Sequence, residues 1–316
     1  RPPMKKPLIP ALSLLLLTAI LFPLLVDNPY LVSVVITAYV TAIAVYGLDV
    51  MLGYTGELSL AQGGFFGIGG YSAGILMATY EVSFWIALPA AVVMTAALGY
   101  VIGLAALRTR GDYFAIFTLA VGVMIVIIIE RWEGVTGGTD GLIGIPPPSS
   151  IGPLRFDSLT AQYYLVLFFL VLTIYVVWSL VNSLVGRTFV AVRNSEELAR
   201  AVGIDAGKTH QLSFVISAAL AGLGGALYAV FLGYIGPAMG GVQMTFMMLV
   251  YLMIGGVASL AGPLVGTLLV TGLMQFLQAF AEYQMMALGP ILVVVIIFFP
   301  KGLAGLAKLL PERWRR

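Results

Sequence analysis

Residues 193–234 read RNSEELARAVGIDAGKTHQLSFVISAALAGLGGALYAVFLGY, a charged segment followed at once by an apolar one. The apolar part, 210–234, is long enough for a helix to cross a hydrocarbon core of about 30 Å. Similar runs recur along a chain that is 60% hydrophobic and 9% charged, with a mean hydropathy of +1.04. The runs do not alternate apolar and polar residues as the strands of a transmembrane β-barrel would. The sequence therefore predicts an all-α, polytopic membrane protein.

The apolar runs predict about ten transmembrane segments, arranged as one membrane domain over residues 1–316. They lie near 8–26, 30–52, 58–80, 84–107, 113–131, 162–185, 210–234, 243–260, 261–281 and 284–299. The first run follows Lys5 and Lys6 and so looks like a signal peptide. It lacks a small-residue cleavage site and is long enough to span, so we interpret it as the first transmembrane helix.

Basic residues predict the orientation, because cytoplasmic loops retain Lys and Arg. With ten spans and a cytoplasmic N-terminus, 14 of the 16 basic residues fall on the cytoplasmic side. They are Arg1, Lys5, Lys6, Arg108, Arg110, Arg187, Arg193, Arg200, Lys208, Lys301, Lys308, Arg313, Arg315 and Arg316. This orientation places both termini and the connection 186–209 in the cytoplasm. The connection 132–161, rich in Gly and Pro, is then periplasmic.

The third segment, 58–80, is rich in glycine, with SLAQGGFFGIGGYSAGIL beginning at Ser59. Its glycines recur at intervals of three or four residues, which is typical of a helix face that packs closely against a neighbour in lipid. The same composition also fits a broken or re-entrant helix that lines a path, since irregular backbone is tolerated at membrane depth where protein or water covers it. Glycine spacing does not separate the two interpretations.

If this segment lines a translocation path, Gln62 is its best candidate contact for a polar solute, because an amide both donates and accepts hydrogen bonds. Phe65, Phe66 and Tyr71 would form the surrounding walls. The alternative is an interhelical hydrogen bond for Gln62 and ordinary packing for the aromatic rings.

The charged segment predicts a short helix from Ser195 to Val202. Asn194 suits the N-cap, with Glu197 completing a capping box, and Gly203 suits the position that ends the helix. The predicted polar face holds Glu196, Glu197 and Arg200, and the opposite face holds Leu198, Ala199, Ala201 and Val202. Two turns are too short to be stable alone in water, so the helix needs either a docking partner or the lipid headgroups.

Enzymatic chemistry finds little support in the composition. The chain has no Cys and one His, His210, so neither a metal site nor a nucleophile with its base is predicted. The stretch GIDAGKT at 203–209 is similar to a phosphate-binding loop, but it is one residue short and precedes an apolar helix rather than following a strand. We therefore predict no cofactor, metal or nucleic-acid site in this chain.

The run 186–229 is similar to the permease subunits of ABC importers of the branched-chain amino acid type, specifically the LivM-type subunit. Its ELARAVGID, 197–205, matches the motif that in this family docks in a groove of the ATPase. Further matches are GYTGELSLAQGGFFGIGGYSAGIL at 53–76, LRTRGDYFAIFTLAVG at 107–122, TGGTDGLIGIPPP at 136–148 and FPKGLAGL at 299–306. The resemblance implies an ATPase-coupling helix made by Asn194, Glu196, Glu197, Ala199, Arg200, Gly203 and Asp205.

The resemblance also implies partners and a location. They are a homologous LivH-type permease, two ABC ATPases that use ATP and Mg, a periplasmic binding protein, and the bacterial inner membrane. Family members often carry a Glu and an Arg where this chain has Val123 and Val126. Urea, short amides and aromatic carboxylates therefore stay open as cargo beside branched-chain amino acids.

An ion-coupled secondary transporter is the competing class. It would use acidic residues in the membrane interior, for which the candidates are Asp49, Glu57, Glu81, Glu130 and Glu282.

Overall fold

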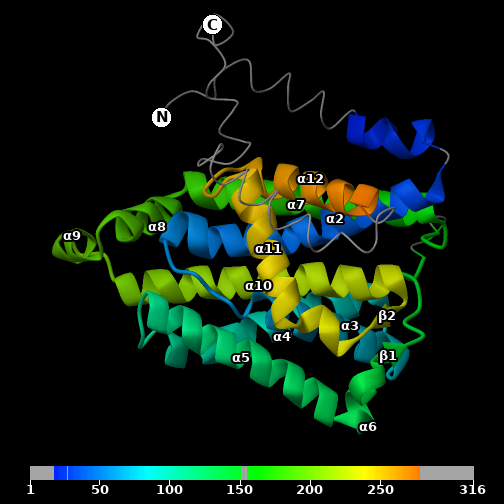
Figure 1. Cartoon of the computed structure of the whole chain (residues 1–316), viewed down its shortest axis with the longest axis horizontal. Helices are drawn as coiled ribbons and strands as arrows, with labels where there is room; N and C mark the ends of the chain where they lie inside the picture. The colour runs from blue at the N-terminus through cyan, green and yellow to red at the C-terminus, as the bar shows by residue number, and fades with distance from the viewer. Residues whose placement is uncertain (1–17, 27, 151, 153–154, 278–316) are drawn as a thin grey trace, which may run out of the picture.

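The protein is described by a computed structural model, which covers residues 18–26, 28–150, 152 and 155–277 (Figure 1). Helices dominate this part of the chain, as the apolar runs predict. Residues 18–25 are helical, whereas residues 8–17 of the predicted first span and all of the predicted span 284–299 lie outside the described residues. Glu282 and the segment 299–306 lie outside them as well.

Five described helices are long and apolar enough to cross a membrane. They are α2 (Pro29–Asp49, continued by a π-helical segment, η1, at Val50–Thr55), α4 (Phe84–Ala106), α5 (Asp112–Arg131), α7 (Leu159–Asn182) and α10 (Ala206–Leu232). Shorter apolar helices are α3 (Gln62–Ala78), α11 (Val242–Gly255) and α12 (Gly262–Leu277). These eight helices correspond to the eight predicted segments between residues 30 and 281, which confirms a helical membrane protein.

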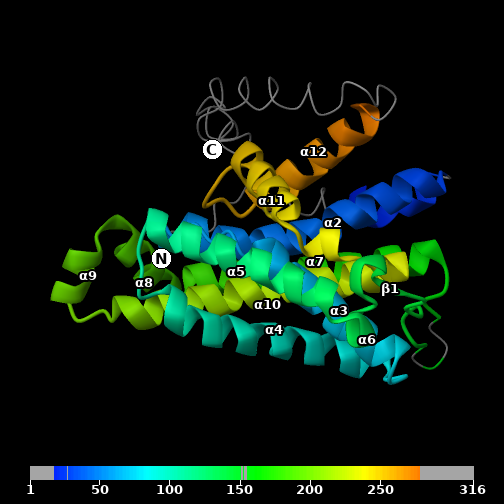
Figure 2. The same ribbon diagram turned by 60° about the horizontal axis from the view of Figure 1, so that its bottom comes forward.

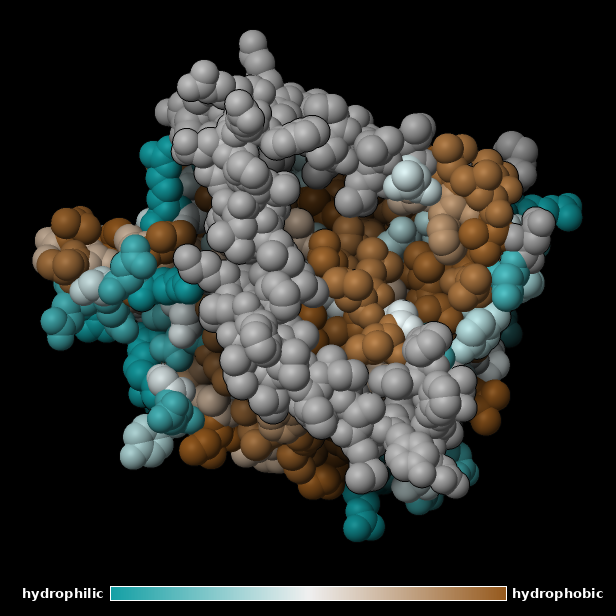
Figure 3. All heavy atoms as spheres, turned by 45° about the horizontal axis from the view of Figure 1, so that its top comes forward, coloured by the Kyte–Doolittle hydropathy of each residue, from teal (hydrophilic) through white to brown (hydrophobic). Residues whose placement is uncertain are grey.

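The long helices run side by side along the longest axis of the molecule (Figures 1 and 2). α10 lies at the centre, packed most extensively on α3, α4 and α2, while α7 and α12 cover α2. Two short helices, α8 (Leu184–Asn194) and α9 (Glu196–Ala201), lie at one end of the bundle, the α9 end. Where Figure 3 shows described residues between the two ends, the surface is largely hydrophobic, and hydrophilic residues lie toward both ends, many of them at the α9 end.

Contact between α3 and α10 depends on glycine. A Cβ on Gly69 would overlap the backbone of Gly222, and one on Gly225 would overlap the carbonyl of Phe66. Because no larger residue fits, the glycine-rich face packs closely against a neighbouring helix. α3 is also continuous over its 17 residues, so the break that the alternative interpretation predicts does not occur within it. The irregular backbone instead precedes α3, at 56–61.

The connection 132–161 is folded back onto the opposite end of the bundle. It contains α6 (Glu133–Thr136), the 3-10 turn η2 (Gly138–Asp140) and strand β1 (Leu142–Ile143). β1 pairs antiparallel with β2 (Tyr234–Ile235), which follows α10 and precedes the 3-10 turn η3 (Pro237–Gly240). These two short strands are the described exception to the all-α prediction, and they tie the connection to the α10–α11 segment.

Candidate functional site

The predicted cytoplasmic connection contains one more helix than expected. α7 ends at Asn182, and the Ser183 hydroxyl caps α8 by accepting a hydrogen bond from the Gly186 N–H at 3.3 Å. The predicted span 162–185 therefore extends too far, because its last residues begin this new helix. α8 buries Phe189 and Val192 and packs against the π-helical end of α2.

The coupling helix begins one residue later than predicted. The N-cap of α9 is Ser195, whose hydroxyl accepts a hydrogen bond from the Leu198 N–H at 3.3 Å. Asn194 is the last residue of α8, so it does not cap α9, and Glu197 cannot complete the predicted capping box. The prediction was wrong because α8 continues through the position that the cap would need. Gly203, with φ +87°, follows the C-cap Val202 and ends the helix as predicted.

The two faces of α9 also differ from the prediction. Ala199 is buried and packs with Val192 and Ala206, and Glu196 is turned toward the chain as well. Leu198 and Val202 point outward, with 70% and 76% of their surface exposed. The chain itself supports this short helix, so its length alone does not require a partner. A docking partner is indicated instead by the exposed apolar side chains of Leu198 and Val202, which form the apolar tip of α9.

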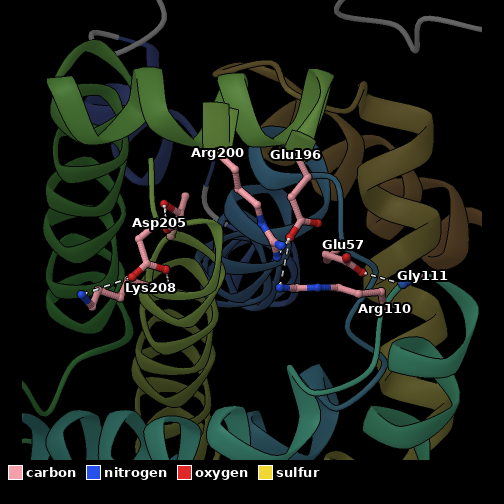
Figure 4. A network of polar contacts seen from close by, with 8 residues as sticks. Glu57, Arg110, Gly111, Glu196, Arg200, Asp205 and Lys208 are labelled. Carbon is pink, nitrogen blue, oxygen red and sulfur yellow. Dashed lines mark hydrogen bonds and ion pairs between the residues drawn. The ribbon is translucent and has the colours of Figure 1, made fainter. Parts of the chain in front are cut away.

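A network of charged side chains holds the inner face of α9 (Figure 4). The Glu196 carboxylate accepts a hydrogen bond from Arg200 at 2.6 Å and lies 3.4 Å from the Arg110 guanidinium, which comes from the α4–α5 connection. Beside it, Glu57 accepts a hydrogen bond from the Gly111 N–H at 3.2 Å. The α4–α5 connection is thus bound both to the segment before α3 and to α9.

Partial burial shapes the electrostatics of this network. Burial raises the pKa of the Glu57 carboxyl above its usual range and Glu196 adds to the rise, while the Gly111 N–H and the Arg110 charge oppose it. One guanidinium nitrogen of Arg110 and the Nδ1 of His210 are buried and have no hydrogen-bond partner among the described residues. The site is therefore a partly buried polar junction.

A second connection joins α8 to α2. The Arg193 guanidinium donates a hydrogen bond to the carbonyl of Gly53, in the π-helical segment. Gly56 follows with φ +87°, and a Cβ there would lie 3.0 Å from the Arg193 side chain. π-Helical turns are rare and occur frequently at functional sites. The end of α2 that carries this irregularity is the end that α8 contacts.

Asp205 belongs to a different helix from the one predicted. It is the N-cap of α10, where its side chain accepts a hydrogen bond from the Lys208 N–H at 3.0 Å. That N–H and the Lys208 ammonium, 3.2 Å away, hold the pKa of the Asp205 carboxyl below its usual range. Asp205 therefore belongs to the start of α10, the helix that follows α9, and not to α9 itself.

The predicted path residues lie in the bundle interior. Gln62 is completely buried at the start of α3, and its amide donates to the Ala44 carbonyl at 2.8 Å and accepts from the Ser217 hydroxyl at 3.0 Å. This arrangement matches the interhelical alternative. Phe65 and Phe66 are packed among other rings, whereas the buried hydroxyl of Tyr71 has no hydrogen-bond partner among the described residues. A translocation path along these residues stays a prediction.

Arg110 and Arg193 are the two site residues that the sequence reasoning counted only as topology markers. Both lie in clusters assigned to the same side as α9, which was a signal that they could lie near it. Only Arg110 meets an acidic residue of α9, because Arg193 donates to the Gly53 carbonyl. The sequence does not say which cluster pairs with which carboxylate.

Comparison with known proteins gives a consistent result. The family described as branched-chain amino acid transport system, permease component, matches residues 30–297. The chain is 30% identical to the high-affinity branched-chain amino acid transport system permease protein LivM of Escherichia coli, over 93% of this chain and 74% of the relative. It is 24% identical to the permease protein LivH of the same system in that organism, over 84% of this chain and 91% of the relative.

The permease protein BraD of Pseudomonas aeruginosa is 25% identical, over 84% of this chain and 91% of that protein. No solved structure gives a significant match. The family match covers most of the chain, and the apolar helices that carry it include all five of membrane-spanning length. The chain thus belongs to the family of branched-chain amino acid transport permeases, as a multi-pass helical membrane protein.

Proposed function

We propose that the chain is the LivM-type permease subunit of a bacterial inner-membrane ABC importer, and that it forms the translocation path together with a LivH-type permease. The observation that carries the coupling mechanism is the geometry of α9, a braced helix with an exposed apolar tip. Relatives named as LivM and as LivH transport permeases both match the chain, which supports a permease pair.

α9 is suited to dock in a groove of an ATPase. In both ribbon views α9 extends beyond the ends of the long helices (Figures 1 and 2). A helix in that position projects away from the hydrocarbon region, which favours a protein partner over the lipid headgroups. Leu198 and Val202 would fill the groove, and Glu197 would lie at its rim. Closure of two ATPases that bind ATP and Mg would then push on α9.

The proposed topology has ten spans in a single membrane domain, with both termini and α9 in the cytoplasm. The connection 132–161 then faces the periplasm, where a binding protein delivers the cargo. The proposed cargo is a branched-chain or related amino acid, as the names of the relatives suggest. Urea, short amides and aromatic carboxylates are the alternatives within the same importer class.

The docking proposal is tested with Val202→Asp and Glu197→Lys. Each should leave the permease inserted but lower the amount of ATPase that co-purifies with it by about tenfold. Val202→Asp places a charge that cannot be desolvated in an apolar groove, and Glu197→Lys reverses the charge at its rim. Ile143→Asp is the matched control, since Ile143 is 73% exposed on β1, at the opposite end of the molecule. Normal co-purification and normal uptake for both α9 variants would contradict the proposal.

A second measurement separates this function from ion-coupled transport. Uptake by cells that express the whole system should collapse when ATP is depleted and persist when an uncoupler dissipates the proton gradient. The reverse pattern would support a secondary transporter.

A further inference from the structure

Asp49 is a buried carboxylate that joins distant parts of the chain. It is the last residue of α2, and only 1% of its surface is exposed. Its Oδ1 accepts a hydrogen bond of 2.7 Å from the N–H of Ala258, which lies in the turn between α11 and α12. Oδ2 has no hydrogen-bond partner among the described residues. Burying a carboxylate costs free energy, so its presence here needs an explanation, and its hydrogen bond to Ala258 suggests one.

The turn that Asp49 holds is strained and tightly fitted. Ala258 has φ +55°, a left-handed conformation that is unfavourable for a residue with a side chain and that persists where surrounding contacts impose it. Tyr46 donates a hydrogen bond to the Leu260 carbonyl in the same turn at 2.7 Å. A Cβ on Gly53 would overlap Asp49 Oδ1 and lie 2.8 Å from the Ala258 nitrogen. The contact therefore needs Asp49, the turn and a glycine at position 53 together.

Gly53 also belongs to the connection with α8. Its carbonyl accepts the hydrogen bond from Arg193, one residue before the end of α8 and three before the start of α9. A continuous series of contacts thus runs from α9 through Arg193 and Gly53 to Asp49 and the α11–α12 turn. It continues along α11, where the Thr245 hydroxyl accepts a hydrogen bond of 2.8 Å from the Gly63 N–H, at the start of α3.

We propose that Asp49 is a positioning residue for transport, which fixes the α11–α12 turn to the π-helical end of α2. A displacement of α8 and α9 then moves α11 and α12 and reaches the start of α3. The inference rests on the proposed docking of α9 to an ATPase. The group that matters is the acceptor oxygen Oδ1, so the negative charge is not required. An ion-binding carboxylate would need the charge, and this difference separates the two roles.

The test uses the complete importer, with both permeases, ATPases and binding protein, in proteoliposomes. Uptake of radiolabelled leucine per ATP hydrolysed is measured for assembled complexes, together with their thermal stability. Asp49→Leu removes the acceptor, Asp49→Asn keeps one, and Gly53→Ala leaves every hydrogen-bonding group in place but forces Asp49 and Ala258 apart. Gly134→Ala is the matched control, because a Cβ at this exposed glycine meets nothing within 4 Å.

We expect Asp49→Leu and Gly53→Ala to lower uptake per ATP by about tenfold or more, since a buried N–H left without its acceptor can shift a two-state equilibrium by that factor. Asp49→Asn and Gly134→Ala should stay close to wild type. Tyr46→Phe should give a smaller loss of the same kind. It keeps the ring, so it remains informative if the stronger variants fail to assemble.

Unchanged uptake per ATP in Asp49→Leu and Gly53→Ala would overturn the inference, and so would a loss that follows only a loss of assembled complex. If the Asp49→Leu and Gly53→Ala complexes do not assemble, unchanged uptake per ATP in Tyr46→Phe would overturn the inference too. If Asp49→Asn loses as much uptake per ATP as Asp49→Leu, the inference is overturned in favour of a charged, ion-binding role. A wild-type complex that shows no ATP-driven uptake of leucine or of the alternative cargos would overturn the proposed function and the inference with it, which distinguishes the two failures.

Discussion

Gln62 joins three helices through one amide. It starts α3, donates to the backbone of α2 at Ala44 and exchanges hydrogen bonds with Ser217 of α10, whose hydroxyl donates to the Gln62 oxygen. Because lipid provides no hydrophobic driving force between helices, such bonds, together with close glycine packing, fix which faces meet. Gly63, the next residue of α3, donates a hydrogen bond to Thr245 of α11. Gln62 therefore lies next to the contact through which a movement of α11 would reach α3.

We predict that Gln62→Leu lowers the free energy of unfolding by about 1–3 kcal/mol, because it leaves the Ala44 carbonyl and the Ser217 hydroxyl without their partner. Thermal unfolding in detergent measures the loss. Gln211→Leu is the control, since the Gln211 amide makes one partly exposed hydrogen bond, to the Tyr100 carbonyl at 2.7 Å. If stability is kept and only transport falls, Gln62 lines the path instead.

α9 gains its position from residues outside itself. Ser195 caps it, Val192 and Ala206 pack against its Ala199, and Arg110 draws Glu196 toward the α4–α5 connection. The Arg110 and Glu196 side chains are each about one-third exposed, at 34% and 30%. Water therefore screens their attraction, and the pair contributes less than about 1 kcal/mol to stability. Its role is to orient the helix rather than to hold the fold together.

Charge exchange across this pair tests that role. Glu196→Arg and Arg110→Glu should each reduce ATP-driven uptake several-fold while leaving thermal stability nearly unchanged, because each single change places like charges together. The double exchange should restore part of the uptake, because an arginine at position 196 regains an opposite charge at position 110 but loses its pairing with Arg200. Lys208→Glu is the control, since it disrupts the more exposed ion pair with Asp205 at the start of α10. A double variant no better than either single variant would show that the pair does not orient α9.

The whole molecule has two chemically different ends. α8 and α9 carry charged residues and an apolar tip at one end, while the β1–β2 pair ties two connections together at the other (Figure 1). The long helices between them expose large apolar side chains, as expected where lipid surrounds a bundle. The proposed orientation places the α9 end in the cytoplasm.

The absence of cysteine makes the orientation directly measurable. In intact cells with a permeable outer membrane, Ser150→Cys should react with an impermeant maleimide. Val202→Cys, expressed without the ATPase, should react only after the inner membrane is permeabilised. Both positions are exposed, so access to the reagent rather than burial decides the result. Labelling at position 202 but not at position 150 in intact cells would contradict the proposed topology and indicate the opposite orientation.

Apolar runs alone predicted the eight apolar helices described between residues 29 and 277, and most of their ends to within a few residues. The physical reason is that burial in lipid depends on the hydrophobicity of a contiguous segment. Gly203 as the end of the coupling helix was predicted for a similarly local reason, because a left-handed residue favours glycine. Local sequence features of this kind were enough to predict where α9 lies in the chain to within one residue.

Tertiary structure alone decided which polar groups meet. Asp49 and Ala258 are 209 residues apart, and Glu196 finds its cation on the α4–α5 connection. The predicted faces of α9 were wrong because Arg110 and the Val192–Ala206 contact turn Glu196 and Ala199 inward. Hydrophobicity is a property of each segment, but a hydrogen bond or ion pair requires two groups within a few ångströms of each other. Helix packing across the whole bundle sets those distances.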